Sequence, residues 1–493
     1  MKNKEKCGNR ALSCLIYMSF FLLGFFVSNC TITVKASSSS SVNVAVTQQL
    51  NKDYSLRGQK YINGSWYYFD DSTGNVVTGW KYIAAQKKTV YYAADGKMLY
   101  GQQHIGGKWY YLNDTTGAVT TGFKYIQSQR KTVYYAANGQ LQYGQQHING
   151  SWYYFDDITG GVVTGWKYIA AQKKTVYYAA DGKMLYGQQH IGGKWYYLND
   201  TTGAVTTGFK YIQSQRKTVY YATNGQLQYG QQHINGKWYY FDSVTGAMKT
   251  GFQLIKNQNK IVYYNTAGQM LYGRQKINGI TYSLNTVSGA LSISNISLQL
   301  AEANFAQKTN QTIVTVANYK KTANVYLYQK DTNGIWSQVI ATSAGHVGYN
   351  GLGKTYEGAG KTPQGAYTLG TAFGSHASVS TGLSYRQADS RSYWIEDVND
   401  SAYNTWQERS YAKAPSEHLL SYPTQYEYGI VINYNTNPVV KGAGSGFFVH
   451  VSTGGSTAGC VSVPRSVLIA MLAKLNKGAY IVNVNTESQI SSY

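Results

Sequence analysis

The stretch Gly58-Gln-Lys-Tyr-Ile-Asn-Gly-Ser-Trp-Tyr-Tyr-Phe-Asp70 sets the pattern of the first half of the chain. Self-similarity at a fixed period of this kind is typical of a repeat architecture. The leading glycine returns every 43 residues, at Gly58, Gly101, Gly144, Gly187, Gly230 and Gly273. Residues 58–294 are therefore expected to form an array of repeats.

Short aromatic runs alternate with turn-forming pairs inside each repeat. At Asn63-Gly64, Asn149-Gly150 and Asp95-Gly96 the chain can take the positive φ angles of a tight hairpin turn. The flanking Trp-Tyr-Tyr and Val-Tyr-Tyr runs favour strands. Because a hairpin of this size cannot bury enough surface alone, the pattern predicts a solenoid of stacked hairpins.

Aromatic rings left exposed between hairpins are the candidate ligand contacts of this array. Flat rings suit the faces of sugars, and cages of rings suit quaternary ammonium groups. Most of the tyrosines are expected to build the core of the solenoid instead. The candidate ligand-binding tryptophans are Trp66, Trp80, Trp109, Trp152, Trp166, Trp195 and Trp238.

Four histidines recur in phase with the repeat, at His104, His147, His190 and His233. No cysteine or carboxylate accompanies them at the spacing of a metal site. We interpret them as repeated packing positions, and we expect neither a metal nor a cofactor in this protein.

The first 36 residues have the features of a secretory signal peptide. Four basic residues precede an apolar stretch over residues 11–29, and Val34-Lys-Ala36 supplies small residues for cleavage. An uncleaved membrane anchor is the alternative. Residues 37–57 follow as a serine-rich linker, and no later segment is apolar enough to span a bilayer.

The balance of charge is strongly basic. The formal net charge is +22, and it falls to +18 once residues 1–36 are removed. A secreted basic protein is drawn to anionic polymers such as teichoic acids, acidic glycans or lipid headgroups. The positive charges are dispersed and no nucleic-acid motif is present, so nucleic acid is not an expected partner.

The second half of the chain has a different composition. All five prolines lie at or after Pro363, and strand-like runs begin at Thr312. We expect a linker or short helical segment over residues 295–310 and one mostly β domain over residues 311–493. The glycine-rich stretch Gly348–Gly365 favours a loop that approaches a ligand closely, or a long flexible connection.

Outside the expected signal peptide the chain has one cysteine, Cys460, which follows His450 by ten residues. An exported protein with one thiol has no internal disulfide partner, which leaves a reactive thiol, an intermolecular bridge or an inert buried residue. A helix is predicted after Pro464, and the positive end of its dipole would favour a thiolate at Cys460.

The surroundings of Cys460 favour the reactive thiol. His450 is the candidate general base, and the backbone amides of Gly459 and Cys460 are candidates for an oxyanion hole. The alternative is a buried structural cysteine beside an incidental histidine.

The repeat pattern Gly-x-Trp-Tyr-Tyr-Phe-Asp-x-x-Thr-Gly-x-x-x-Thr-Gly-Trp resembles the cell-wall-binding repeats of Gram-positive surface proteins, the choline-binding and glucan-binding families. The resemblance covers residues 58–294. It implies a wall polymer as partner and leaves glucan, teichoic acid and choline open. The second halves of the repeats often carry Val90-Tyr-Tyr92 where choline cages of that family need a tryptophan.

The second half resembles the L,D-transpeptidase catalytic domain, the YkuD family. The motifs that agree, in order, are Gly348-Tyr-Asn-Gly351, Glu357-Gly-Ala-Gly-Lys-Thr-Pro-Gln-Gly365, Trp394-Ile-Glu-Asp397, Ser416-Glu-His-Leu419 and the segment from His450 to Cys460. The resemblance implies a mostly β, sandwich-like fold with a few helices, Cys460 as nucleophile and His450 as base. It also implies peptidoglycan stem peptides as substrate.

The candidate substrate-lining residues are Tyr349, Lys361, Thr362, His418, Ser456 and Thr457. The larger part of the family has a histidine two residues before the cysteine, where this chain has Ala458. A second imidazole therefore cannot orient the thiol from that position. His418 is a candidate substitute or a packing residue, and His346 and His376 are interpreted as packing residues.

The resemblance implies acyl transfer in two steps, in a secreted enzyme of a Gram-positive cell wall that takes part in wall biogenesis and cell shape. Cys460 attacks a stem peptide, and an amine then takes the acyl group to form a cross-link. If water takes the acyl group, the enzyme is an L,D-carboxypeptidase. A third hypothesis, from a different class, is a wall-bound adhesin with an inactive catalytic domain.

Overall fold

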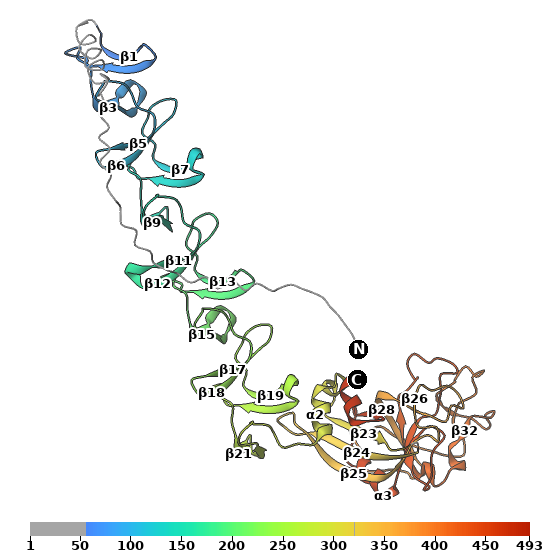
Figure 1. Ribbon diagram of the computed structural model, residues 1–493. Helices are drawn as coiled ribbons and strands as arrows, with labels where there is room; N and C mark the ends of the chain where they lie inside the picture. Colours follow the sequence, from blue (N-terminus) through green and yellow to red (C-terminus); the bar gives the residue numbers. More distant parts are fainter. Residues whose placement is uncertain (1–55, 320) are drawn as a thin grey trace, which may run out of the picture. The chain divides into compact units, whose positions relative to one another are not determined.

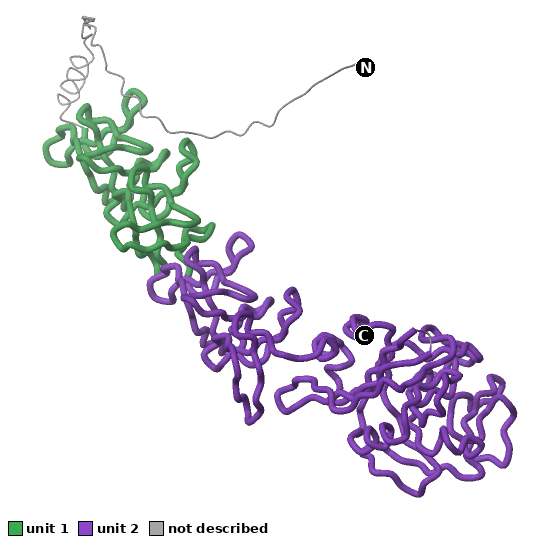
Figure 2. The backbone as a smooth tube through the Cα atoms, turned by 60° about the horizontal axis from the view of Figure 1, so that its bottom comes forward, with its two compact units in different colours: residues 1–185 green, residues 186–493 purple. Residues whose placement is uncertain are grey.

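The computed structural model describes residues 56–319 and 321–493. The expected signal peptide and nearly all of the expected linker over residues 37–57 lie outside the described residues. The chain divides into two compact units, one ending at Leu185 and one beginning at Tyr186 (Figure 2). None of the helices within the described ranges has the length and apolar character needed to cross a lipid bilayer.

The first unit consists of antiparallel two-stranded hairpins that follow one another along the chain (Figure 1). Their strands are β1 (Gly58–Ile62) with β2 (Ser65–Phe69), β3 (Gly79–Ile83) with β4 (Lys88–Tyr92), β5 (Gly101–Ile105) with β6 (Lys108–Leu112), β7 (Gly122–Ile126) with β8 (Lys131–Tyr135), β9 (Gly144–Ile148) with β10 (Ser151–Phe155), and β11 (Gly165–Ile169) with β12 (Lys174–Tyr178).

The second unit begins with hairpins of the same kind and continues into the C-terminal domain. These hairpins are β13 (Gly187–Ile191) with β14 (Lys194–Leu198), β15 (Gly208–Ile212) with β16 (Lys217–Tyr221), β17 (Gly230–Ile234) with β18 (Lys237–Phe241), β19 (Gly251–Ile255) with β20 (Lys260–Tyr264), and β21 (Gly273–Ile277) with β22 (Ile280–Leu284). The expected array of hairpins is thereby confirmed.

Two kinds of turn alternate along the array. Asn63 and Gly64 take φ angles of 49° and 82°, which is the predicted hairpin turn between β1 and β2. Between β3 and β4 the chain instead makes a short 3₁₀ helix, η1 (Ala84–Gln86), and closes with Lys87 at φ 46°. Equivalent turns hold η2 (Gln127–Gln129), η3 (Ala170–Gln172), η4 (Gln213–Gln215) and η5 (Lys256–Gln258).

The predicted tight turn at Asp95-Gly96 is present, with Gly96 at φ 81°, but it does not connect two of the strands given above. These residues follow β4 and close a tight loop in which the amide of Gly96 donates to the carbonyl of Ala93 at 2.9 Å. The loop returns Met98 to a single bridge with Tyr92. An Asp-Gly pair favours a turn both between two paired strands and after the end of a strand. Only the pairing of the neighbouring strands distinguishes these two positions.

The return segments connect successive hairpins. The amide of Met98 donates to the carbonyl of Trp66 at 2.8 Å, and the amide of Leu141 donates to that of Trp109 at 2.9 Å. Tyr92, Tyr135 and Tyr178 are fully buried between these segments. Each hairpin therefore depends on its neighbour for both hydrogen bonds and core, which is the physical basis of a solenoid.

The C-terminal domain is built on a nine-stranded sheet in the order β29-β28-β33-β34-β35-β25-β24-β23-β36. A further pairing of β28 with β36 closes the sheet on itself. Its strands are β23 (Gln311–Ala317), β24 (Thr322–Lys330), β25 (Trp336–His346), β28 (Gly365–Gly374), β29 (Tyr385–Gln387), β33 (Tyr428–Ile432), β34 (Phe448–Val451), β35 (Val461–Val463) and β36 (Tyr480–Val484).

Smaller elements surround this sheet. They are β26 (Leu352–Gly353) with β27 (Thr362–Pro363), the three-stranded group β30 (Ser392–Trp394), β31 (Trp406–Glu408) and β32 (Glu417–His418), the helices α2 (Asn295–Glu302) and α3 (Arg465–Leu472), and the 3₁₀ helices η6 (Phe305–Lys308), η7 (Leu419–Ser421), η8 (Gln425–Glu427) and η9 (Glu487–Ser492). The domain is mostly β with a few helices, as predicted.

Both helices contribute side chains to the domain core. Leu468, Met471 and Leu472 of α3 are fully buried in the main cluster. Ile296 and Leu300 of α2 pack into a second cluster, which includes Val314 of β23 and Val482 of β36. Residues 295–310, for which we expected a linker or short helical segment, thus form α2 and η6 and pack against the domain.

We expect Leu468→Ala to lower the free energy of unfolding of this domain by about 2–5 kcal/mol, because it leaves a cavity under α3. Urea unfolding of the full chain, followed by alkylation of the buried Cys460 thiol and peptide mass analysis, measures this. Leu420→Ala, at a side chain that is 37% exposed, is the control and should change the midpoint little. Equal midpoints for the two variants would contradict the packing described here.

Candidate active site

The pairing of β34 with β35 brings the two predicted catalytic residues together. The strands are parallel, with Val449 opposite Val461 and His450 opposite Ser462. Cys460 immediately precedes β35, and the intervening loop folds back between the two strands. Cys460 and His450 both line one pocket of about 490 Å³ and are 8% and 7% exposed.

Hydrogen bonds tie this loop to the glycine-rich segment. The hydroxyls of Thr362 and Thr457 donate to the carbonyl of Cys460 at 3.1 and 2.6 Å. Gly459 lies so close to the Phe447 ring that a Cβ there would be 2.6 Å from it. The close approach explains why glycine precedes the cysteine.

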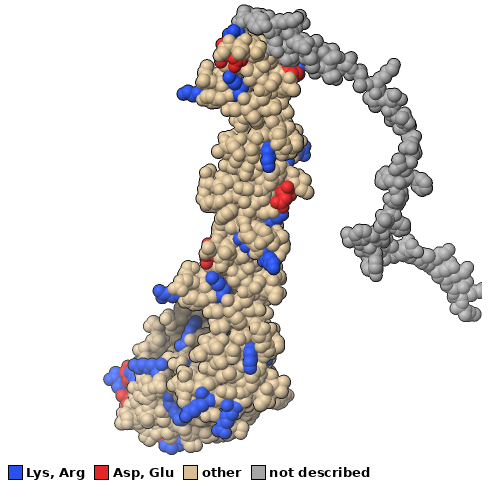
Figure 3. Space-filling model, turned by 90° about the vertical axis from the view of Figure 1, so that its left-hand side faces the viewer, with Lys and Arg blue, Asp and Glu red and all other residues tan. Residues whose placement is uncertain are grey.

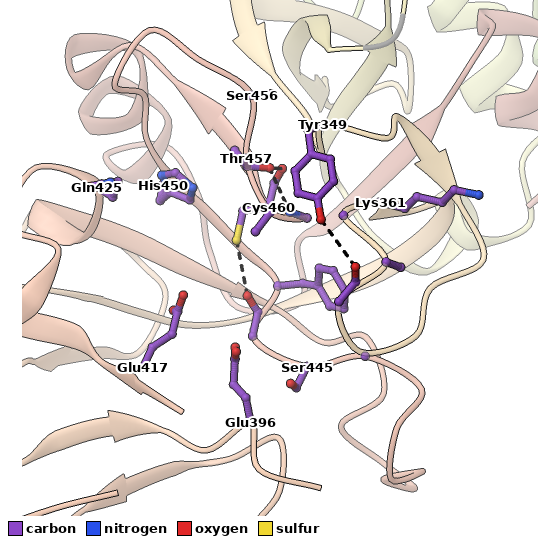
Figure 4. A pocket seen from close by; sticks show the side chains of 18 of the residues that line it. Tyr349, Lys361, Glu396, Glu417, Gln425, Ser445, His450, Ser456, Thr457 and Cys460 are labelled. Carbon is purple, nitrogen blue, oxygen red and sulfur yellow. Dashed lines mark hydrogen bonds between the residues drawn. The ribbon is translucent and has the colours of Figure 1, made fainter. Parts of the chain in front are cut away.

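The thiol of Cys460 points away from the imidazole (Figure 4). Its Sγ donates to the carbonyl of Gly446 at 3.4 Å and accepts from the amide of Phe448 at 3.3 Å. His450 is held by a 2.8 Å contact between Nδ1 and the carbonyl of Val451, so Nδ1 carries the proton and Nε2 is free of one. A neutral imidazole of this tautomer is suited to act as a base.

Burial determines the protonation of the pair. It raises the pKa of the Cys460 thiol well above its ordinary value, and the nearby carboxyl of Glu417 raises it further. Burial also lowers the pKa of His450 to about 4. In the unliganded pocket the pair is therefore a neutral thiol and a neutral imidazole.

The expected activation of Cys460 by a helix dipole was wrong. The helix α3 begins at Arg465, and the whole of β35 separates it from Cys460. Dipole effects fall off within the first turn of a helix. The predicted start of the helix after Pro464 is correct. The three residues before Pro464 form β35, which the sequence did not predict and which separates Cys460 from the helix.

The predicted oxyanion hole is only partly open in this state. The amide of Gly459 donates to Thr457 Oγ1 at 3.1 Å. Gly459 can join an oxyanion hole only when this hydrogen bond is released. The role of Gly459 and Cys460 thus stays a prediction.

Of the candidate substrate-lining residues, Tyr349, Lys361, Ser456 and Thr457 line the pocket. Thr362 lies behind it, fully buried, where its hydroxyl accepts from the amide of Gly348 at 2.9 Å.

His418 does not line the pocket, which corrects that prediction. Its ring nitrogens contact Ser390 O at 3.1 Å and Ser421 Oγ at 3.0 Å. The preceding residue, Glu417, lines the pocket instead, because neighbouring side chains on a strand point to opposite faces. The ring of Tyr426 packs edge-on against His450, with 5.7 Å between ring centroids.

Sequence reasoning missed several pocket residues, notably Glu357, Glu396, Glu417, Tyr422, Tyr426 and Ser445. The signal for three of them was present, since Glu357, Glu396 and Glu417 belong to the quoted motifs. Only the fold shows that these motifs meet at the thiol.

The candidate tryptophans of the array fall into two groups. Trp66, Trp109, Trp152, Trp195 and Trp238 lie on the second strand of every other hairpin and are 36–41% exposed. The in-phase histidines lie against four of them, as His104 does against Trp109 at 4.9 Å between centroids. This placement fits a packing role for the histidines.

The second group lies where two hairpins meet. Trp80 contacts Tyr91 and Tyr110 with ring centroids 4.9 and 4.7 Å apart, beside a cavity that Lys88 also lines. At the equivalent places Trp166 contacts Tyr177, while Phe123 takes the tryptophan's position in another repeat. Three-ring clusters of this kind recur along the array.

Lysine side chains occupy other ring faces. Lys81 Nζ lies 4.5 Å from the ring centroid of Tyr68, whose hydroxyl donates to Asp71 at 2.7 Å, and the arrangement recurs at Lys124, Lys167 and Lys210. Figure 3 shows lysine and arginine scattered over the face in view rather than gathered in a patch. On this face the basic charge is therefore distributed, as the sequence predicts.

The fold and this pocket define the C-terminal half as a mostly β domain with a buried cysteine–histidine pair. Residues 311–484 match the family model of the L,D-transpeptidase catalytic domain. Residues 77–122 and 163–208 match the choline-binding repeat, and residues 60–75, 146–157 and 232–243 match a cell wall binding repeat. The C-terminal half thus matches the model of an L,D-transpeptidase catalytic domain and the N-terminal half matches models of wall-binding repeats, which confirms both resemblances.

Solved structures of choline-binding proteins are similar to parts of the chain. CbpJ from Streptococcus pneumoniae is 24% identical, covering 48% of this chain and 93% of its own, with a TM-score of 0.41. Choline binding protein F from Streptococcus pneumoniae, solved in the presence of a peptidoglycan analogue, is 25% identical, covering 57% and 100%, with a TM-score of 0.36. No curated protein sequence matches the chain.

The protonation of the pair predicts the reactivity of Cys460. At pH 7 we expect iodoacetamide to label Cys460 more slowly than a free cysteine, with a rate that still rises above pH 9, because the thiol is protonated and buried. His450→Ala should leave this pH profile unchanged, since no thiolate–imidazolium pair exists to be lost. The control is the urea-unfolded chain, which should label like a free cysteine. Fast labelling at pH 7 that His450→Ala abolishes would contradict the neutral pair.

Proposed function

We propose that this protein is a secreted cell-wall enzyme that forms peptidoglycan cross-links by L,D-transpeptidation through an acyl-enzyme on Cys460. The observation that carries the proposal is the meeting of Cys460 and His450 in one pocket of a domain that matches the L,D-transpeptidase model. The neutral protonation state of the pair defines how such a reaction begins.

Rotation of the Cys460 side chain toward His450 is the first step. Nε2 of His450 then takes the thiol proton as Sγ attacks the carbonyl carbon of the third residue of a tetrapeptide stem. Because the pKa of His450 is low, the imidazole passes this proton on readily to the leaving amine of D-alanine. The C–N bond breaks, and the third residue remains bound to Cys460 as a thioester.

The second step decides the product. An amine of a neighbouring stem or cross-bridge attacks the thioester, the C–S bond breaks, and the thiol is restored as the cross-link forms. Attack by water gives an L,D-carboxypeptidase with the same residues. The amides of Gly459 and Cys460 are the proposed donors to the oxygen that becomes negative in both steps.

Catalysis should depend on both residues to different degrees. We expect Cys460→Ala to abolish product formation from defined muropeptides, and His450→Ala to lower the rate by about 10²–10⁴-fold through loss of the base. Mass analysis of dimer and tripeptide products measures both rates and separates transpeptidation from hydrolysis. His346→Ala, at a histidine outside the pocket, is the control. Full activity of Cys460→Ala would contradict the proposal.

We further propose that the repeats hold the enzyme on a wall polymer, with glucan, teichoic acid or choline as the candidate ligands. The support is the recurrence of partly exposed tryptophans every 43 residues, which gives the chain several contact points for a polymer. Several weak contacts of this kind multiply into firm attachment.

Removal of the exposed tryptophan rings tests this attachment. Alanine at Trp66, Trp109, Trp152, Trp195 and Trp238 together should reduce the binding of the full chain to isolated cell walls about tenfold or more. The matched control replaces the exposed apolar residues Ile158, Val244 and Val287 by alanine, which removes apolar surface but no ring. Equal wall binding by the two variants would overturn the proposed role of the tryptophans. Competition by free choline or by soluble glucan then identifies the ligand.

A further inference from the structure

Three glutamate side chains line the pocket that holds the thiol: Glu357, Glu396 and Glu417. The pairing of Trp394 with Glu417 brings β30 and β32 together, and Glu396 follows β30 by two residues. Figure 4 shows the carboxyl groups of Glu396 and Glu417 on the side of Cys460 toward which the sulfur points. None of these carboxyls takes part in the two steps of the proposed reaction.

The three carboxyls differ in their partners. Glu357 accepts from the hydroxyls of Tyr403 and Ser445, and Glu417 accepts from that of Tyr426. The carboxyl of Glu396 forms no hydrogen bond or ion pair within the part of the chain that the structure describes. Its Oε1 lies against Gly446, where a Cβ would be only 1.8 Å away.

Among the described residues, no cationic side chain forms an ion pair with this group. Lys361 is the basic residue of the pocket lining, and its side chain extends away from the carboxyls (Figure 4). Burial and repulsion by Glu417 raise the pKa of Glu396 to about 9, and burial raises that of Glu417 as well. Burial and mutual repulsion therefore disfavour the ionised forms of these carboxyls, and a cation beside them would favour ionisation.

A second polar group of the pocket also lacks a partner in the described part of the chain. Ser462, opposite His450 on β35, also lines the pocket and is 1% exposed. Its Oγ has no hydrogen-bond partner among the described residues. A buried hydroxyl without a partner is costly, so an occupant that supplies a polar group at this depth is favoured.

We propose that Glu396 and Glu417 form a subsite for an alkylammonium group of the peptidoglycan stem peptide. The inference rests on the proposed function, and it names the chemistry that function leaves open. A stem that accepts a cross-link carries a free amine, which is an ammonium ion at neutral pH. The ammonium belongs either to the stem bound as acyl donor or to the acceptor amine.

For an acceptor, the carboxyl has a chemical role. The ammonium must lose a proton before its nitrogen can attack. Binding of the cation favours ionisation of the Glu396 carboxyl, which releases its own proton to solvent and then takes one from the ammonium. The free amine then forms the C–N bond, the C–S bond breaks, and the second amine proton reaches the departing sulfur through His450. Burial raises the pKa of Glu396 toward that of an ammonium, so this carboxyl is a better proton acceptor for the ammonium than an ordinary one.

The variants Glu396→Gln and Glu417→Gln test the subsite, because glutamine keeps the shape and cannot ionise. One arm compares acylation of Cys460 by tetrapeptide stems that carry lysine or norleucine at the third position. The other arm offers Nα-acetyl-L-lysine amide as acceptor and measures the ratio of aminolysis to hydrolysis. If the subsite binds the donor stem, the acylation rate of the lysine stem falls about tenfold or more, and that of the norleucine stem is unchanged. If it binds the acceptor amine, the ratio of aminolysis to hydrolysis falls about tenfold or more.

The control is Glu302→Gln, which makes the same change of charge on α2, outside the pocket. Its rates should equal those of the unmodified protein, and the thermal midpoints of all variants should agree. If both pocket variants retain both rates, the proposal is overturned.

The failure of the proposed function would be a separate result. If the unmodified protein forms no acyl-enzyme with any stem, calorimetric titration with Nα-acetyl-L-lysine amide still measures the subsite. The subsite is supported if the lysine amide binds, its norleucine analogue does not, and the glutamine variants no longer bind the lysine amide. Equal binding of the two amides contradicts it.

Discussion

The parallel pairing of β34 with β35 is the constraint on which the site depends. It places His450 beside Ser462 and delivers Cys460 to the start of β35, so that the loop between the strands must turn back within a few residues. Small residues and threonine hydroxyls make that turn possible, with the carbonyl of Cys460 held at 2.6 Å by Thr457. The closed sheet keeps both strands buried, and it thereby sets the low-dielectric surroundings of the thiol.

Those surroundings define the chemistry of the pair. Burial favours the neutral forms of both Cys460 and His450, and the carboxyls of Glu417 and Glu396 favour the neutral thiol further. A buried and protonated thiol is a weak nucleophile. In our proposal it reacts when a substrate brings a carbonyl and a cation into the pocket, and the repeats keep the protein where such substrates are abundant.

Much of this structure could be predicted from local signals. Asn63-Gly64 and the 43-residue period indicate hairpins and their stacking, because turn geometry and periodicity are properties of neighbouring residues. The proximity of His450 and Cys460 followed from spacing and family resemblance. Glu417 and His418 were not distinguished, because which of two adjacent residues faces the pocket depends on the pairing of β32 with β30. The strand between Cys460 and α3 was missed for the same reason, since its partners lie far away in sequence.

If Cys460 carries the acyl group in the proposed reaction, direct capture of the acyl-enzyme tests this most sharply. The protein is incubated briefly with a tetrapeptide stem, quenched in acid and digested. The mass of the peptide that contains Cys460 is then measured by mass spectrometry. We expect the mass of this peptide to rise by the mass of the acyl group, that is, the stem without its terminal D-alanine. One D-alanine should be released for each protein molecule. Turnover of the stem with an unmodified Cys460 peptide, or an adduct at any other residue, would contradict it.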